Sequence, residues 1–192
     1  MDVVAALRAG RPVLLPTDTV YGLMATPDED GVHSVYRLKG RPSSQPTALM
    51  TPSVDVLLGL VPELPRELEA LLPGPYTLVL PNPRRRFLWL AGTRPDAIGV
   101  RIPALSTAAT AVLESVGCVA ATSANDPGGP DPLSLADVPA RLRDACPALD
   151  EGPLHGIPST VIDLTGPEPR ILREGAVCAE EALARVRATP AQ

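Results

Sequence analysis

Histidine and aromatic residues are scarce in this chain of 192 residues, which has two histidines, three tyrosines, one phenylalanine and one tryptophan. Platforms on which the bases of a single strand could stack are therefore few. His33 lies on an expected helix and His155 in a glycine-containing loop, and neither has an evident serine or cysteine partner in the sequence. A histidine-based nucleophilic mechanism is therefore disfavoured, although a partner could still come from a distant part of the chain.

Several motifs that mark common enzyme classes are also missing. The chain has no Gly-x-x-x-x-Gly-Lys-Ser/Thr phosphate loop, no Gly-x-Gly-x-x-Gly fingerprint and no His-Glu-x-x-His zinc helix. Its three cysteines, Cys118, Cys146 and Cys178, are widely spaced, which fits neither a disulfide framework nor a zinc knuckle. No segment reaches the roughly 18 apolar residues needed to cross a bilayer, and the first residues lack the basic start of a signal peptide. We therefore expect a soluble, cytoplasmic protein without membrane contact.

Basic residues are outnumbered, since 17 lysines and arginines face 22 acidic residues and give a net charge of −5. Loose attraction to nucleic acid depends on a broad basic surface, so this balance argues against it. Arg84 to Arg86 form one basic run beside Phe87 and Trp89, for which a solvated loop is favoured over a nucleic-acid patch. Any cationic site must therefore be local.

Apolar spacing and turn residues predict alternating helices and strands in one domain. Expected helices cover 2–9, 28–38, 53–60, 65–72, 106–115, 134–144 and 180–187, and expected strands cover 13–15, 47–51, 76–80, 98–102, 118–122, 159–164 and 170–173. The last two strands are close enough to pair antiparallel, so we expect an α/β fold with a twisted mixed sheet flanked by helices. Residues 126–132, rich in glycine and proline, are either a mobile lip over a site or a plain surface loop.

Polar side chains follow several of these apolar strands, and two cations lie at the C-terminal end of the expected helix 28–38. The four basic residues are Arg101 and Arg173 at strand ends and Lys39 and Arg41 at the helix end, and they are accompanied by the hydroxyls or amides of Thr17, Thr19, Ser123, Asn125 and Ser159. Arginine forks bind carboxylate or phosphate oxygens in pairs, and lysine acts as a movable point charge. This set suits anionic substrates, which it would stabilise by electrostatics and positioning without a protein nucleophile.

Seven motifs in order resemble the YrdC-like family of threonylcarbamoyladenylate synthases. They are Pro-Thr-Asp-Thr-Val-Tyr-Gly-Leu (16–23), Lys-Gly-Arg-Pro (39–42), Pro-Gly-Pro-Tyr-Thr (73–77), Val-Arg-Ile-Pro (100–103), Ser-Ala-Asn (123–125), Ser-Thr-Val-Ile-Asp (159–163) and Leu-Arg-Glu-Gly (172–175). The resemblance implies one YrdC-like domain over 1–187 with a large concave substrate cavity, followed by a short tail over 188–192. It corresponds to the shorter form of the family, which lacks the additional C-terminal domain.

The resemblance implies that L-threonine, bicarbonate and ATP are joined into L-threonylcarbamoyladenylate with release of pyrophosphate. The product would pass to tRNA-modifying proteins that form N6-threonylcarbamoyladenosine (t6A) at position 37 of tRNA. Mg²⁺ would accompany ATP without a protein metal site, and no organic cofactor is implied.

The resemblance also implies roles for individual residues. Lys39 and Arg41 would be catalytic. Threonine would be bound by Thr19, Arg101, Ala121 and Ser159, and ATP by Lys39, Arg41, Ser123, Asn125 and Arg173.

Three positions depart from the family pattern. Met50 stands where many relatives have a histidine that contacts the amino acid, and Thr122 replaces a common proline. Asp131 stands where relatives offer a hydroxyl near the nucleotide, and its charge is unfavourable there unless Mg²⁺ or Arg41 offsets it. Either threonine is held by fewer polar contacts, or the substrate differs.

Two other functions remain open at this point. One is a non-enzymatic module that binds RNA, including double-stranded RNA, or nucleotides, which the acidic net charge disfavours. The other is carbamoyl transfer, as in hydrogenase-maturation proteins that carry this domain within a much longer chain. The length of this chain and its lack of their zinc-finger cysteines disfavour that role.

Overall fold

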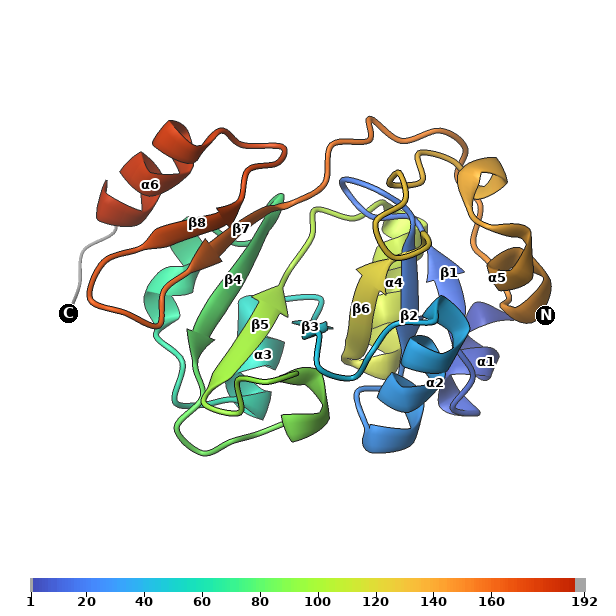
Figure 1. The fold of residues 1–192 in the computed structure, drawn as a ribbon, viewed down its shortest axis with the longest axis horizontal. Helices are drawn as coiled ribbons and strands as arrows, with labels where there is room; N and C mark the ends of the chain where they lie inside the picture. The colour runs from blue at the N-terminus through green and yellow to red at the C-terminus, as the bar shows by residue number, and fades with distance from the viewer. Residues whose placement is uncertain (1, 189–192) are drawn as a thin grey trace.

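The structure, a computed structural model, describes residues 2–188 and contains an eight-stranded mixed sheet (Figure 1). The strands are β1 (Val13–Leu15), β2 (Gly22–Ala25), β3 (Ala48–Met50), β4 (Tyr76–Pro81), β5 (Ala97–Arg101), β6 (Val119–Ser123), β7 (Thr160–Asp163) and β8 (Arg170–Arg173). They lie in the order β1-β2-β6-β3-β5-β4-β7-β8. Two neighbouring pairs, β3 with β5 and β4 with β7, are parallel, and the other pairs are antiparallel. The expected α/β fold with a mixed sheet is confirmed.

Helices flank the sheet, as Figure 1 shows. The α-helices are α1 (Val3–Arg8), α2 (Glu29–Lys39), α3 (Val54–Leu60), α4 (Thr107–Val116), α5 (Ala140–Ala145) and α6 (Ala179–Ala188), and the 3₁₀ turns are η1 (Arg66–Ala70), η2 (Leu88–Leu90) and η3 (Leu135–Asp137). Of the helices that the structure describes, none is long and apolar enough to cross a membrane.

The sheet has two halves, which meet at the three-residue strand β3 (Figure 1). In the β1-β2-β6 half, alternate side chains enter different apolar clusters: Val13 and Leu15 contact the cluster of α1 and α4, whereas Leu14 contacts that of α2 and α5. Both faces of this half are therefore buried. Strand side chains alternate between the two faces of a sheet, so a half covered on both sides is apolar throughout.

The other half, formed by β4, β5, β7 and β8, is covered on one face only. Leu78, Val100 and Ile162 pack into the cluster that includes α3 and residues of α6. The intervening side chains, such as Thr77 and Arg101, point to the opposite face, where they line a cavity. The alternation along β4, β5 and β7 thus separates a core face from a face available to ligands.

Helix α2 carries two of the predicted site residues to the middle of the molecule. Its N-terminus is capped by the carboxylate of Asp28, which accepts from the amide of Gly31 at 2.7 Å. It ends at Gly40, whose left-handed φ of 62° favours glycine. Lys39 is therefore the last helical residue, and Arg41 follows the cap, as the sequence predicts.

Three expectations about elements differ from the structure. Residues 22–25 form strand β2, although the sequence predicts only a strand end and a turn there. The strand was not predicted because the hydroxyl residues at 17 and 19 favour a turn just before it. Residues 65–72 form a 3₁₀ turn over Arg66–Ala70 instead of a longer helix. The expected helix 134–144 is divided into η3 and α5 at Pro139, whose missing N–H cannot continue a helix.

A glycine permits close approach between β8 and the segment that precedes β7. A Cβ on Gly175 would lie 2.7 Å from the carbonyl carbon and oxygen of Ser159, closer than side chains tolerate. The amide of Ala176, one residue on, donates to Pro158 O at 2.8 Å. The glycine of the Leu-Arg-x-Gly motif therefore allows the end of β8 to pack directly on Ser159.

We expect Gly175→Ala to lower the free energy of unfolding by about 1–3 kcal/mol, because the added methyl must push two backbone segments apart. Urea denaturation followed by circular dichroism measures the change. Gly166→Ala is the matched control in the same hairpin, since a Cβ there meets nothing closer than Glu168 O at 3.9 Å. Equal losses in both variants would contradict the packing argument.

Candidate active site

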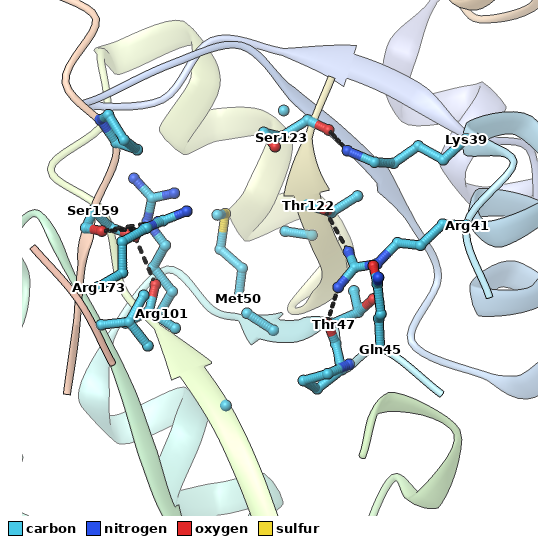
Figure 2. Close-up of a pocket in the computed structure, with 18 of the residues that line it drawn as sticks. Lys39, Arg41, Gln45, Thr47, Met50, Arg101, Thr122, Ser123, Ser159 and Arg173 are labelled. Carbon is cyan, nitrogen blue, oxygen red and sulfur yellow. Dashed lines mark hydrogen bonds between the residues drawn. The ribbon is translucent and has the colours of Figure 1, made fainter. Parts of the chain in front are cut away.

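One cavity of about 610 Å³ opens between the two halves of the sheet, and all four basic residues singled out in the sequence line it. Figure 2 shows Arg101 and Arg173 on one wall and Lys39 and Arg41 on the opposite wall, with Met50 between them. Cavities of 300–1,000 Å³ are typical of small-molecule sites. Residues separated by more than a hundred positions in the chain thus converge on one hollow.

Arg101, the last residue of β5, is held by the Pro-Thr-Asp-Thr segment. Its Nη2 donates to the carboxylate of Asp18 at 2.5 Å and to the hydroxyl of Thr19 at 2.6 Å, and Asp18 also accepts from the amide of Ala104 at 3.1 Å. Burial lowers the pKa of Arg101 from its ordinary value, and the charge of Asp18 counteracts this. The carboxylate of Asp18 therefore fixes the direction of the guanidinium, and it does so from one side only.

One nitrogen of the Arg101 guanidinium, Nη1, remains for a ligand. Its Nη2 is occupied by Asp18 and Thr19, and no hydrogen bond of Nη1 is formed with the residues that the structure describes. Nε is buried and also has no hydrogen-bond partner among those residues, but its N–H points to the side of Nη2. Nη1 is therefore the donor that Arg101 offers to one oxygen of a carboxylate in the cavity.

Arg173 lies on the same wall as Arg101 and is held by Ser159. Its Nε and Nη2 donate to Ser159 O at 3.1 and 2.8 Å, and Nη2 also contacts Ser159 Oγ at 3.1 Å. Ser159 Oγ is in turn 2.8 Å from the hydroxyl of Thr77 on β4. The positive charge of Arg173 contributes to lowering the pKa of Arg101. Two like charges so close together indicate that an anion belongs beside them.

On the opposite wall, Lys39 is the only lysine of the chain. Its Nζ donates to Ser123 O at 2.6 Å and to Asn125 Oδ1 at 2.9 Å, and the residue is only 4% exposed. Burial, followed by the charge of Arg41, lowers the pKa of Lys39 to about 8, while Asp131 acts in the opposite direction. Since an ammonium has three donors, one remains for a ligand.

Arg41 is anchored at three points beside Lys39. Its Nε donates to Gln45 Oε1 at 2.8 Å, Nη1 donates to Thr122 Oγ1 at 2.9 Å, and Nη2 donates to Pro46 O. The dashed line from Thr122 in Figure 2 shows this contact across from β6. The threonine that replaces a common family proline therefore supplies an acceptor that proline lacks, and it directs the guanidinium along the cavity wall.

The segment 126–132 forms part of the cavity rim. Asn125 donates from Nδ2 to Gly129 O at 2.8 Å and contacts Asp131 Oδ1 at 3.4 Å, while its Oδ1 accepts from Ser123 Oγ at 2.7 Å. Pro127, Gly128, Gly129 and Asp131 line the cavity. This placement favours a lip over the site, as against a plain surface loop. Asp131 brings a negative charge into the cavity, as the sequence indicates.

The other predicted site residues occupy different depths. Ala121 lines the cavity, whereas Thr19 is buried behind Arg101 and Thr17 takes its place at the surface of the hollow. Met50 is 1% exposed and brings a thioether, not a polar group, to the cavity. Gln45 and Thr77, which contact Arg41 and Ser159, were not singled out individually from the sequence. Thr77 and Ser159 are 82 positions apart, so no local pattern shows their contact. Gln45 is only four residues after Arg41, and this spacing was the signal that could have indicated it.

Comparisons with known proteins agree with this geometry. The model of the Sua5/YciO/YrdC family, described as "Telomere recombination", matches residues 5–175. The threonylcarbamoyl-AMP synthase of Pyrococcus abyssi is 37% identical over 182 residues, which are 91% of this chain and 53% of that protein. A putative threonylcarbamoyl-AMP synthase of Mycobacterium tuberculosis is 36% identical over 94% of this chain and 85% of its own length. The chain thus spans about half of the first relative and most of the second.

Solved structures show the same fold. The crystal structure of P. abyssi Sua5 complexed with L-threonine has a TM-score of 0.83 and 36% identity, and the match covers 95% of this chain and 56% of that one. The structure of Escherichia coli YciO has a TM-score of 0.74 and 28% identity, with 90% and 87% covered. From the extent of the family model and the identity of these relatives, this chain belongs to the Sua5/YciO/YrdC family.

Proposed function

We propose that this protein is an L-threonylcarbamoyladenylate synthase, which forms its product and pyrophosphate from L-threonine, bicarbonate and ATP. The observation that carries the proposal is the convergence of two cationic walls on one cavity, where Arg101 and Arg173 face Lys39 and Arg41. The reaction must hold a carboxylate, a carbamate and a triphosphate together, and each repels the others. Relatives named threonylcarbamoyl-AMP synthase support the same activity.

In the proposed complex, the carboxylate of threonine accepts from Nη1 of Arg101 and pairs with its positive charge. Thr19 acts through Arg101 and does not touch the amino acid, because its hydroxyl accepts from Nη2 behind the cavity wall. Ser159 and Thr77 offer hydroxyls beside Arg101, and Ala121 leaves room for the carbon skeleton. The α-amino group would then point toward the opposite wall, where its carbamate forms.

The phosphates of ATP would lie along Lys39 and Arg41. Ser123 and Asn125 would contact the nucleotide on that wall, and Arg173 would contact it from the opposite wall. Condensation of the amine with bicarbonate expels water and gives a carbamate. A carbamate oxygen then attacks the α-phosphorus, and pyrophosphate leaves with the electrons of the broken P–O bond. Lys39 and Arg41 stabilise the charge that develops on the phosphate oxygens, without forming a covalent bond to the substrate.

Mg²⁺ would enter with the phosphates of ATP. Among the residues that the structure describes, no group of three or more histidine, cysteine or acidic side chains could hold a metal. Asp131 does line the cavity, and its carboxylate suits the oxygen-ligand preference of Mg²⁺. The ion would offset repulsion between Asp131 and the phosphates, with Asp131 as its protein contact.

The product is a reactive mixed anhydride, so it would pass to proteins that transfer the threonylcarbamoyl group to tRNA, in the cytoplasm. Direct RNA contact is not part of this proposal. The net charge of −5 and the placement of the cations inside a cavity offer no broad basic surface to an RNA backbone.

The activity is tested by incubating the protein with ATP, bicarbonate, Mg²⁺ and one amino acid at a time. Mass spectrometry of the adenylate and a pyrophosphate assay report the products. We expect adenylate and pyrophosphate in equal amounts, dependent on both threonine and bicarbonate. Nucleotide binding without turnover would favour the binding-module alternative, and pyrophosphate exchange driven by carbamoyl phosphate without threonine would favour carbamoyl transfer.

The two walls should respond differently to substitution. Arg101→Ala should raise the Kd of threonine by roughly 10–100-fold, because it removes a charge-assisted hydrogen bond, and should change ATP affinity little. Lys39→Ala should lower the rate of adenylate formation by about 100-fold or more and leave the Kd of threonine within about threefold. Calorimetry and the product assay measure both effects. Unaltered threonine affinity in Arg101→Ala, with the fold intact, would remove Arg101 from the carboxylate site.

The single lysine makes its protonation directly observable. In protein labelled with ¹³C at the lysine ε-carbon, we expect one resonance that titrates near pH 8, because burial lowers the pKa of Lys39. Bound ATP should raise this pKa, since the triphosphate favours the ammonium form. The kcat/KM for ATP should accordingly fall as pH rises through about 8. A free-protein pKa near the ordinary 10.5 would show that burial is not the controlling influence.

A further inference from the structure

A fifth basic side chain, Arg94, also lines the cavity. It precedes β5 by three residues, whereas Arg101 is the last residue of that strand. Ala97 and Arg101 alone are about 13 Å apart at the usual rise of a strand. Thr93, Val79 and Ala97 line the cavity with Arg94. A cation thus stands at each end of the β5 wall.

Arg94 is held in place by side chains of β7 and the turn after it. Its Nη1 donates to Asp163 Oδ2 at 2.9 Å, and its Nη2 donates to Thr165 Oγ1 at 2.7 Å. Burial raises the pKa of Asp163, but hydrogen bonds from Thr165, Arg94 and Arg170 outweigh it and leave the pKa well below its ordinary value. The carboxylate therefore stays charged, and it fixes the guanidinium.

The turn before Arg94 is also fixed to the loop that holds Arg41. The amide of Thr47 donates to Leu90 O at 2.9 Å, and Gly92 adopts a left-handed φ of 60° so close to Pro46 that a Cβ would lie 2.9 Å from its nitrogen. Pro46 O accepts from Arg41. Arg94 and Arg41 consequently belong to neighbouring, mutually packed segments of the cavity wall.

The charge around Asp163 is not balanced. Arg170 donates to the same Oδ2 at 3.0 Å from outside the cavity, so two guanidinium groups share one carboxylate. The side chain of Arg94 is 42% exposed and that of Arg170 is 67% exposed. Each Nη of Arg94 uses one donor, which leaves Nε–H and two Nη–H groups. The cluster carries a net positive charge, and Arg94 presents that charge to the cavity.

We propose that Arg94 forms a second anion subsite of the cavity, which binds a diphosphate group: the β- and γ-phosphates of bound ATP or the pyrophosphate released from it. This inference rests on the proposed synthase function. A carboxylate is not the expected ligand, because Arg101 already offers Nη1 and its positive charge to the amino acid at the other end of β5. The leaving pyrophosphate carries several negative charges that repel the adenylate, so a cation removed from Arg101 favours their separation.

An alternative role for Arg94 is purely structural, since it ties the segment before β5 to β7. Arg170 provides a matched control, because it binds the same oxygen of Asp163 but lies outside the cavity. Arg94→Gln retains a side-chain N–H donor for Asp163 and removes the cavity charge. Arg170→Gln makes the same chemical change without altering the cavity.

Calorimetry with inorganic pyrophosphate, ATP and AMP distinguishes the two roles. We expect Arg94→Gln to raise the Kd of pyrophosphate, of ATP or of both by roughly 10–100-fold, with AMP within about threefold. Arg170→Gln should keep all three within about threefold. An effect on pyrophosphate alone identifies the subsite with the released product, and an effect on ATP alone identifies it with the bound β,γ-phosphates. Arg94→Lys, which keeps the charge, should recover much of the lost affinity.

Two results would overturn the subsite: equal effects of Arg94→Gln and Arg170→Gln, or a loss of AMP binding as large as that of pyrophosphate and ATP. Thermal unfolding identifies a variant that fails to fold. If Arg94→Gln does so, Arg94→Lys decides, because lysine keeps the charge but offers no fork. A small rise in the Kd of pyrophosphate or ATP with AMP unchanged then supports the subsite, and Kd values identical to those of wild type overturn it. Threonine-dependent adenylate formation with unchanged diphosphate binding in Arg94→Gln refutes the subsite alone. Diphosphate binding that depends on Arg94, without adenylate formation, refutes the synthase function alone.

Discussion

The concentration of positive charge in one cavity of an acidic chain is the constraint on which the site depends. Five cations line this hollow, and like charges at short range repel strongly where water is excluded. Among the residues that the structure describes, carboxylates pair with two of these cations, since Asp18 binds Arg101 and Asp163 binds Arg94. The others are held by carbonyl, hydroxyl and amide oxygens, which direct a cation without cancelling its charge. The cavity therefore keeps a net positive potential that an anionic ligand can relieve.

The division of the sheet places these cations on separate halves. Arg101 and Arg173 end strands of the β4-β5-β7-β8 half, whereas Lys39 ends α2 and contacts the end of β6 on the other half. Between the halves, the sheet is continuous only through the three residues of β3. A ligand that contacts both walls consequently bridges the two halves, and its binding free energy stabilises their relative position.

The sequence predicted those parts of the site that depend on local patterns. The positions of Lys39 and Arg41 could be predicted from a helix that Asp28 and Gly40 cap at its two ends. That of Arg101 could be predicted from an apolar strand with a polar residue at its end. Contacts across the sheet could not be predicted in this way. The pairing of Arg94 with Asp163 joins residues 69 positions apart, and it depends on strand order, which periodicity does not encode. The position of Thr19 behind Arg101 could not be predicted either, because residue type alone does not show how deeply a side chain is buried.

Two of the three departures from the expected family pattern, Thr122 and Met50, have opposite consequences for the polar contacts of the cavity. Thr122 adds an acceptor for Arg41, so the wall formed by Lys39 and Arg41 gains a contact that a proline could not supply. Met50 adds none, because a thioether is a weak acceptor and no donor. Met50 pairs in register with Arg101 through β3 and β5, so the missing polar group falls beside the proposed carboxylate site. In the proposed complex, recognition of the amino acid therefore depends more heavily on Arg101 and on the hydroxyls of Ser159 and Thr77 than it would with a polar residue at position 50.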